Sequence, residues 1–321
     1  MLIESEVFID CKYAALLPII LYFKMDIGEF LFDVFYYYDY KPEQGVDSFS
    51  VNITRIKTRK EKLADIGILQ QDYFGDFDVV DMITQAIDNE TPIIIRVDLF
   101  YDRDALFYYQ KIHWAHYLLI YGYDYAQKQF LVYDSVNGTD YHYITKTKSF
   151  LSIIEAYKGF IDFYINNKKL KKPTLMTFHE MTNRHEKIEI CNFLNDLYQK
   201  YMSKINHSLD AIKYFYEDII HLVTNSQNVT YLRVIIDKLS QLCVSKRTIQ
   251  YLQNIPSFYT LNEQRQAAVL NEILLQQYVK LRAIMTKCYY SGILNQNFKR
   301  KVALQCDSIK DNEQKFYKLL L

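Results

Sequence analysis

The sequence predicts an α+β domain followed by an all-α domain. Before residue 165, short β-branched and aromatic runs such as "PIIIRVDLF" (residues 92–100) alternate with helix-like stretches such as "DVVDMITQAIDN" (residues 78–89). After residue 174, apolar residues recur at three- and four-residue spacing almost throughout, as one face of a helix requires. The change from mixed to helical patterning predicts two domains of different class.

The predicted boundary between the domains is the segment "INNKKLKKP", residues 165–173. It is polar and basic and closes on a proline, and seven of the eight glycines lie before residue 160. We therefore predict domains at residues 1–165 and 174–321. The second should hold about five helices, among them the amphipathic segments "EICNFLNDLYQKYMSKI" and residues 261–290.

Composition restricts the class of protein. A chain of 321 residues with 50% hydrophobic residues can bury a full core. Its five cysteines are odd in number and show no CxxC or metal-ligand spacing, so we expect no disulfide framework, no metal and no bound cofactor. No apolar run reaches the roughly 18 residues of a membrane span, and the start "MLIESEVFID" lacks the basic residues of a signal peptide. The expected location is the cytoplasm.

The net charge of zero hides an asymmetry between the halves. Residues 1–165 carry 15 Lys and Arg against 25 Asp and Glu, and residues 166–321 carry 23 against 13. Either the halves dock on each other or expose their charges to solvent, or the basic half binds an acidic partner. Because the basic residues form no stripe with interleaved aromatics and no phosphate loop is present, we expect no nucleic-acid partner.

Two neighbouring apolar runs, "HWAHYLLIYGYD" (residues 113–124) and "QFLVYD" (residues 129–134), predict a pair of strands. The short connection "YAQK" favours an antiparallel hairpin, which places residues 134–136 opposite His116. A carboxylate at Asp134 could then reach the imidazole and fix its orientation. His113 lies three residues from His116 and should point to the other face, so only one of the two can join Asp134. A lone histidine is also commonly structural.

A candidate nucleophile lies near the N-terminus. Asp10 is a good N-cap, which places Cys11 in the first turn of an apolar helix. A helix N-terminus favours the thiolate, whereas the neighbouring Asp10 opposes it. The alternative for Cys11 is a small buried hydrophobic residue. The remaining cysteines lie within helical patterns of the second domain and are expected to pack there: Cys191, Cys243, Cys288 and Cys306.

The order of these features resembles a known fold. Cys11 opens a helix, the proline-led run "TPIIIRVDLFY" follows, His116 precedes an apolar strand that ends in Gly-Tyr-Asp, and Asp134 ends the next strand. This order resembles the papain-like fold, in particular the N-terminal domain family of butirosin-biosynthesis acyltransferases and, more distantly, bacteriocin-processing double-glycine peptidases. The likeness covers roughly the first 165 residues, and helical C-terminal halves also occur in that family.

Two departures from the family pattern affect the expected activity. The glycine-rich segment expected after the first helix is replaced by "GEFLFDVFYYYDYKPEQG" (residues 28–45), which predicts a differently shaped pocket near Cys11. Ser5 stands where papain-type peptidases carry an oxyanion-hole glutamine, which argues against straightforward proteolysis.

The resemblance implies an amide-forming acyltransferase with Cys11, His116 and Asp134 as its triad. The acyl or peptidyl group would come from a carrier-protein thioester, held by its phosphopantetheine arm, and pass through Cys11 to a small-molecule amine in nonribosomal-peptide or aminoglycoside-like biosynthesis. The backbone N–H of Cys11 is the candidate oxyanion donor, and the basic second half is a candidate dock for an acidic carrier protein.

Two other functions fit the same fold. The first is a cysteine peptidase or thioesterase, which discharges the acyl group to water. The second is a non-catalytic domain that binds a partner, an alternative that the replaced glycine-rich segment suggests. The apolar helices near the C-terminus likewise have two interpretations, a homodimer surface or the core of the second domain.

Overall fold

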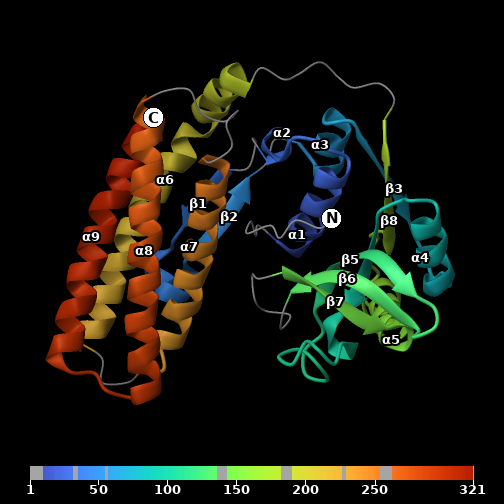
Figure 1. Cartoon of the computed structure of the whole chain (residues 1–321). Coiled ribbons are helices and arrows are strands. Elements are labelled where there is room, and N and C mark those ends of the chain that lie inside the picture. Colours follow the sequence, from blue (N-terminus) through green and yellow to red (C-terminus); the bar gives the residue numbers. More distant parts are fainter. Residues whose placement is uncertain are drawn as a thin grey trace. The chain divides into compact units, whose positions relative to one another are not determined.

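The computed structural model describes residues 10–31, 35–54, 57–135, 143–181, 190–225, 229–253 and 262–320. The chain divides into two compact units (Figure 1). The first unit comprises Met1–Phe30 and Lys57–Lys187, and the second comprises Leu31–Ile56 and Ile188–Leu321. The first is mixed α and β and the second is largely helical, which confirms the predicted fold class.

A six-stranded sheet organises the first unit. Its strand order is β3-β8-β4-β5-β6-β7, and every neighbouring pair is antiparallel. The strands are β3 (Ile68–Tyr73), β4 (Ile93–Asp98), β5 (Ala115–Asp124), β6 (Gln129–Ser135), β7 (Tyr143–Ser149) and β8 (Leu175–Glu180).

Helices cover this sheet. Helix α1 packs on β5, α5 packs on β4, and α3 packs on β3. Every residue of β4 is buried, as expected for a central strand between covered faces. The helices are α1 (Cys11–Tyr22), α2 (Ile27–Leu31), α3 (Arg59–Asp65), α4 (Val79–Asp88) and α5 (Phe150–Phe160), with short turns at η3 (Leu99–Tyr101) and a π-helical extension of α5 at η4 (Ile161–Asn167).

The predicted hairpin is confirmed. Strands β5 and β6 pair antiparallel across the connection at residues 125–128, with Leu119 opposite Tyr133. A register shift at residue 121 accommodates one extra residue in β5. With this register, His116 and Asp134 meet diagonally across the two strands rather than directly opposite each other.

The structure divides the chain differently from the predicted boundary at residues 165–174. The first residues of that segment belong to the π-helical turn η4, and the chain then returns as β8, which inserts between β3 and β4. Without β8, the facing edges of β3 and β4 would carry unpaired backbone groups in the interior of the sheet. The first unit therefore extends past residue 174.

Residues 28–45, which stand where the glycine-rich stretch was expected, belong mostly to the second unit rather than to the first. Strands β1 (Phe35–Asp39) and β2 (Ser50–Thr54) form a separate hairpin, with turns at η1 (Pro42–Gln44) and η2 (Val46–Ser48), and this hairpin belongs to the second unit. Phe49 is fully buried and stacks on Phe215 of the helices at 4.0 Å between ring centroids. Aromatic burial therefore ties this part of the N-terminal half to the C-terminal helices.

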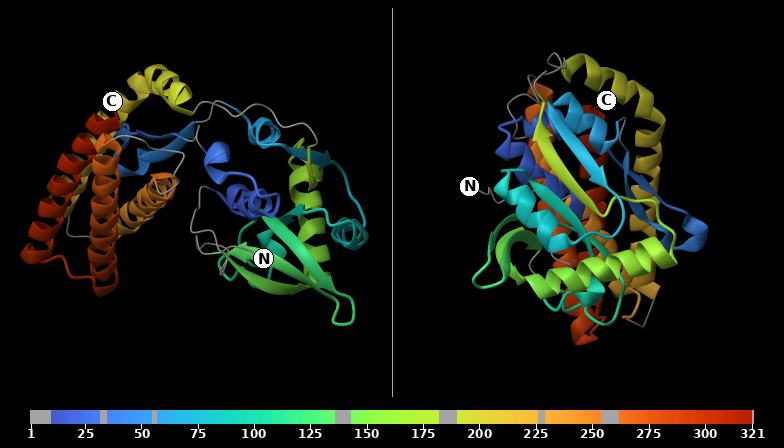
Figure 2. Two further views of the ribbon diagram at one scale, coloured as in Figure 1. Left: turned by 45° about the horizontal axis from the view of Figure 1, so that its top comes forward. Right: turned by 90° about the vertical axis from the view of Figure 1, so that its right-hand side faces the viewer.

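Four long helices accompany this hairpin in the described part of the second unit, where about five were expected (Figure 2). They are α6 (Ile190–Asn225), α7 (Leu232–Gln253), α8 (Asn262–Ser291) and α9 (Gln296–Leu320). The predicted helix over residues 261–290 corresponds closely to α8. Apolar side chains of all four helices meet in one core. Among the described helices, none is both long enough and apolar enough to cross a membrane.

A charged pair lies inside this helical core. Lys246 and Glu313 are fully buried, and their side chains pair at 2.9 Å. Tyr278 donates a further hydrogen bond to Glu313, and the Lys246 ammonium lies 4.2 Å from the ring centroid of Phe316. Such a pair offsets its desolvation only while both partners are present.

We predict that Glu313→Leu lowers the free energy of unfolding by about 3–5 kcal/mol, because it leaves a buried ammonium without its counter-charge. The double variant Lys246→Met with Glu313→Leu should recover most of this loss. Urea denaturation followed by the helical signal at 222 nm measures both. As a control, Asp237→Ala in the exposed Arg233–Asp237 pair should cost less than about 0.5 kcal/mol. A Glu313→Leu cost no larger than that control would contradict the prediction.

Candidate active site

His116 and Asp134 form a buried hydrogen-bonded pair. His116 Nε2 lies 2.8 Å from Asp134 Oδ1, and the two residues are 3% and 2% exposed. Asp134 also pairs with the ammonium groups of Lys146 at 2.9 Å and Lys148 at 3.6 Å. The carboxylate is thus held by three cationic or polar partners from β5 and β7, and it fixes the ring orientation of His116.

Cys11 reaches the same histidine from α1. It is the first residue of the helix and partly exposed, and it shares a side-chain hydrogen bond with His116. Because Nε2 of His116 is engaged by Asp134, the ring nitrogen that faces the sulfur is Nδ1. The structure therefore brings Cys11, His116 and Asp134 together in one hydrogen-bonded series within the first unit.

The electrostatics of this series favour a charged histidine. Burial lowers the pKa of His116, but the hydrogen bonds and negative charges of Asp134 and Cys11 outweigh it and raise the pKa to about 10. Burial raises the pKa of Asp134, but the hydrogen bond and charge of His116, together with Lys148 and Lys146, hold it well below its usual range. At neutral pH the pair is therefore an imidazolium and a carboxylate.

Asp10 caps α1 as predicted, and its charge is compensated. Its carboxylate accepts a hydrogen bond of 2.9 Å from the backbone N–H of Tyr13 and forms an ion pair with Arg59 at the start of α3. The Arg59 guanidinium lies 4.6 Å from the ring centroid of Tyr13. This pairing offsets the negative charge that the sequence places beside Cys11.

His113 belongs to a different pair. Its Nδ1 lies 2.6 Å from Asp98 Oδ2, and Asp98 is fully buried and also accepts backbone N–H bonds from Phe100 and Trp114. The imidazole stacks on Phe100 and Phe163, with centroid distances of 4.3 and 3.7 Å. As predicted, only one of the two histidines joins Asp134.

The other cysteines do not take part in this site. Cys243, Cys288 and Cys306 are buried in the helical unit, and burial raises the pKa of each thiol. These three are packing residues, as predicted. The side chain of Cys191 lies outside the described residues, and so does Ser5 at the expected oxyanion-hole position. No cluster of three or more potential metal ligands occurs in the described ranges.

Residues 56–171 match the model of the Peptidase C39 like family. This segment is a C39-like domain. The family belongs to the papain-like cysteine peptidase superfamily, so the match indicates cysteine peptidase or transferase chemistry. The matched segment includes His116 and Asp134 and begins after Cys11. No curated protein matches the chain.

The sequence interpretation missed the lysines that support the C39-like domain's buried carboxylate. Lys146 and Lys148 are two residues apart in β7, so they share one face of the strand. Lys148 is 5% exposed and also pairs with Asp102 at 2.7 Å. The alternation "TKTK" at residues 145–148 is the available signal, but it does not reveal which carboxylates lie opposite.

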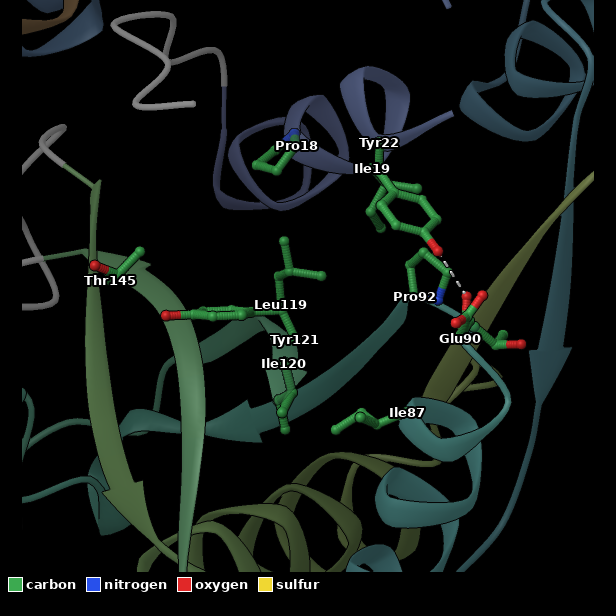
Figure 3. A pocket seen from close by; sticks show the side chains of 11 residues that line it. Pro18, Ile19, Tyr22, Ile87, Glu90, Pro92, Leu119, Ile120, Tyr121 and Thr145 are labelled. Carbon is green, nitrogen blue, oxygen red and sulfur yellow. Dashed lines mark hydrogen bonds between the residues drawn. The ribbon is translucent and has the colours of Figure 1, made fainter. Parts of the chain in front are cut away.

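A cavity of about 680 Å³ lies beside the C-terminal half of α1 (Figure 3). Its wall is mostly apolar, and Tyr22 closes one side by donating a hydrogen bond of 3.1 Å to the carbonyl oxygen of Glu90. None of the three residues in the hydrogen-bonded series lines it. Pro18, the nearest lining residue of α1 in sequence, follows Cys11 by seven positions, about 10 Å along the helix axis. The cavity is thus separate from the candidate active site.

We predict that Asp134→Asn lowers the pKa of His116 from about 10 to below about 8. The amide keeps the shape but removes the negative charge, so burial then dominates and favours neutral imidazole. NMR titration of labelled histidine measures the midpoint. Asp98→Asn, which removes the partner of His113, is the matched control and should leave the His116 midpoint in place. An unchanged midpoint in Asp134→Asn would rule out this electrostatic origin.

Proposed function

We propose that the protein is a cysteine-dependent acyltransferase that takes an acyl or peptidyl group from a carrier-protein thioester onto Cys11 and transfers it to an amine. The observation that carries the proposal is the hydrogen-bonded series from Asp134 through His116 to Cys11. A thiolate beside an imidazolium at a helix start is the arrangement that nucleophilic cysteine catalysis requires.

In the first half-reaction, the Cys11 thiolate attacks the carbonyl carbon of the donor thioester. A new C–S bond forms, and the negative charge moves to the carbonyl oxygen, where the backbone N–H of Cys11 is the candidate donor. When the tetrahedral intermediate collapses, the C–S bond to the carrier arm breaks. His116 gives its proton to the departing thiolate, and the acyl group remains on Cys11.

In the second half-reaction, His116 is neutral and acts as a base. The amine nitrogen attacks the acyl carbon of Cys11, His116 accepts a proton from that nitrogen, and the Cys11 thiolate leaves. The products are an amide and the restored thiolate–imidazolium pair. Asp134 keeps the ring in one orientation through both proton transfers, because it holds Nε2 while Nδ1 exchanges the proton.

The choice between transfer and hydrolysis falls in the second half-reaction, whereas the charge of residues 166–321 bears on the donor. Exchange of one thioester for another is nearly balanced in free energy, so positioning the amine and excluding water determine the outcome. Residues 166–321 carry 23 Lys and Arg against 13 Asp and Glu, a balance that suits an acidic carrier protein as donor.

The second candidate is a cysteine peptidase or thioesterase. The match of residues 56–171 to a peptidase-like family favours it. The first half-reaction is the same, but water replaces the amine in the second. The two functions therefore differ only in what discharges the acyl group from Cys11.

We expect Cys11→Ala to abolish acyl transfer from carrier protein to amine, with a loss of at least about a thousandfold in rate. Intact-mass spectrometry of the wild-type protein mixed with acylated carrier protein should show one acyl group, absent from Cys11→Ala. Cys243→Ala, which alters a buried thiol of the helical unit, is the control and should still be acylated. Acylation of Cys11→Ala at the wild-type level would contradict the proposal.

The acylated protein also separates the two functions. We expect discharge of the acyl group to speed up at least about tenfold when a suitable amine is added. Discharge to water at the same rate with and without amine would favour the hydrolase. His116→Ala should block the first acylation, whereas His113→Ala should not, since His113 pairs with Asp98 instead.

A further inference from the structure

Arg96 of β4 is a buried cation without a hydrogen-bond acceptor for two of its side-chain nitrogens. The residue is 7% exposed, and its Nε and Nη1 are buried and unpartnered. Among the described residues no carboxylate pairs with it. The guanidinium lies over the rings of Tyr117 and Phe160, at 4.9 and 4.5 Å from their centroids. These rings offset part of the cost of burying a permanent charge but cannot replace an acceptor.

The ring of Tyr117 connects Arg96 to the nucleophile. Tyr117 is the cross-strand neighbour of Arg96 on β5, and the ammonium of Lys12 lies 5.7 Å from the same ring. Burial lowers the pKa of Arg96, and the neighbouring Tyr117 and Cys11 oppose this and raise it. Two cations therefore lie against one aromatic ring, and one of them, Lys12, follows Cys11 directly in α1.

Lys12 resembles Arg96 in lacking a partner of its own. Among the described residues it forms no hydrogen bond or ion pair, and Asp10 is taken by Arg59. Burial, and then the charge of Arg59, lower the pKa of Lys12 to about 8 although the carboxylates of Asp72 and Asp10 act to raise it, so its ammonium is still mostly charged at pH 7. Cys11, Lys12 and Tyr117 are partly exposed, so a ligand can reach this cluster from solvent, with Arg96 as its buried wall.

We propose that Arg96 and Lys12, which both lie against the ring of Tyr117, form an anion subsite that binds a carboxylate or phosphate group of the substrate next to Cys11. The inference rests on the proposed function, because it takes Cys11 as the nucleophile. It assigns the substrate class: the acyl donor or acceptor carries an anionic oxygen group close to the reacting carbonyl. A planar guanidinium with free N–H donors matches such a group.

If Arg96 and Lys12 only stabilised the thiolate, Cys11 would react with charged and neutral alkylating reagents differently from what an anion subsite predicts. Iodoacetate and iodoacetamide alkylate a thiolate by the same step, in which sulfur bonds to the CH₂ carbon and iodide leaves, but only iodoacetate carries a carboxylate. A cation that acts on the sulfur changes both rates equally. A subsite that binds the carboxylate changes their ratio.

The experiment measures both alkylation rates of Cys11 in the full-length protein at pH 7 by intact mass. We expect the ratio of the iodoacetate rate to the iodoacetamide rate to exceed that of N-acetylcysteine amide by at least about tenfold, with saturation by iodoacetate only. A ratio equal to that of the model thiol, with neither reagent saturating, overturns the subsite. If Cys11 reacts with neither reagent, the proposed function fails instead.

Substitutions show which side chains raise the ratio of the two alkylation rates. Arg96→Gln should lower the ratio about tenfold toward the model thiol, and Lys12→Gln should lower it in the same direction. Lys168→Gln is the matched control, because it also removes a cation from above aromatic rings, those of Phe163 and Tyr164 in η4. Should Arg96→Gln fail to fold, the Lys12→Gln ratio and the wild-type saturation test still decide. Equal ratios in the wild type, Arg96→Gln and Lys12→Gln would overturn the assignment.

Competition identifies the source of the anion. Protection of Cys11 from iodoacetamide by N-acetylglycine indicates a substrate carboxylate. Protection by 4′-phosphopantetheine but not by pantetheine indicates the phosphate of a carrier arm. Absence of protection by all three compounds at 10-fold excess over the saturating iodoacetate concentration overturns the subsite.

Discussion

The buried hydrogen bond between Asp134 and His116 is the interaction on which the candidate site depends. A carboxylate that is 2% exposed would normally take up a proton, because burial disfavours its charge. His116, Lys146 and Lys148 together keep it ionised. The ionised carboxylate in turn keeps the imidazole charged and occupies Nε2, which leaves Nδ1 for Cys11. Removing any of these charges would therefore alter the protonation of the nucleophile's partner.

Support for this carboxylate extends well beyond the three residues of the series. Lys148 holds Asp134 and Asp102 at once, so the charge balance of the site includes a turn that follows η3. At the other end of the series, Arg59 compensates Asp10 beside Cys11. The helix and the strands thus each bring a charged residue together with its counter-charge. These pairings offset the desolvation free energy of the buried charges, so the domain stays folded.

Local patterns in the sequence were enough to predict the elements that carry the site. The cap at Asp10 and the hairpin across residues 125–128 depend on neighbours a few positions apart, and the periodicity of residues 261–290 reveals a helix. The position of β8 could not be predicted, because it pairs with β3 and β4 about 80 or more residues earlier in the chain. The pairing of Lys148 with Asp102, which spans 46 residues, is hidden for the same reason.

Two histidine–aspartate pairs occur in the first unit, and their histidines lie three residues apart, so such a pair does not by itself define a catalytic centre. His113 with Asp98 has the shorter contact, 2.6 Å against 2.8 Å, yet its ring stacks on Phe100 and Phe163. His116 differs because its second ring nitrogen meets a sulfur at a helix start. The register of β5 with β6 brings His116 to Asp134, and the register of β5 with β4 leaves His113 beside Asp98. These two registers therefore decide which pair can activate a nucleophile and which one packs.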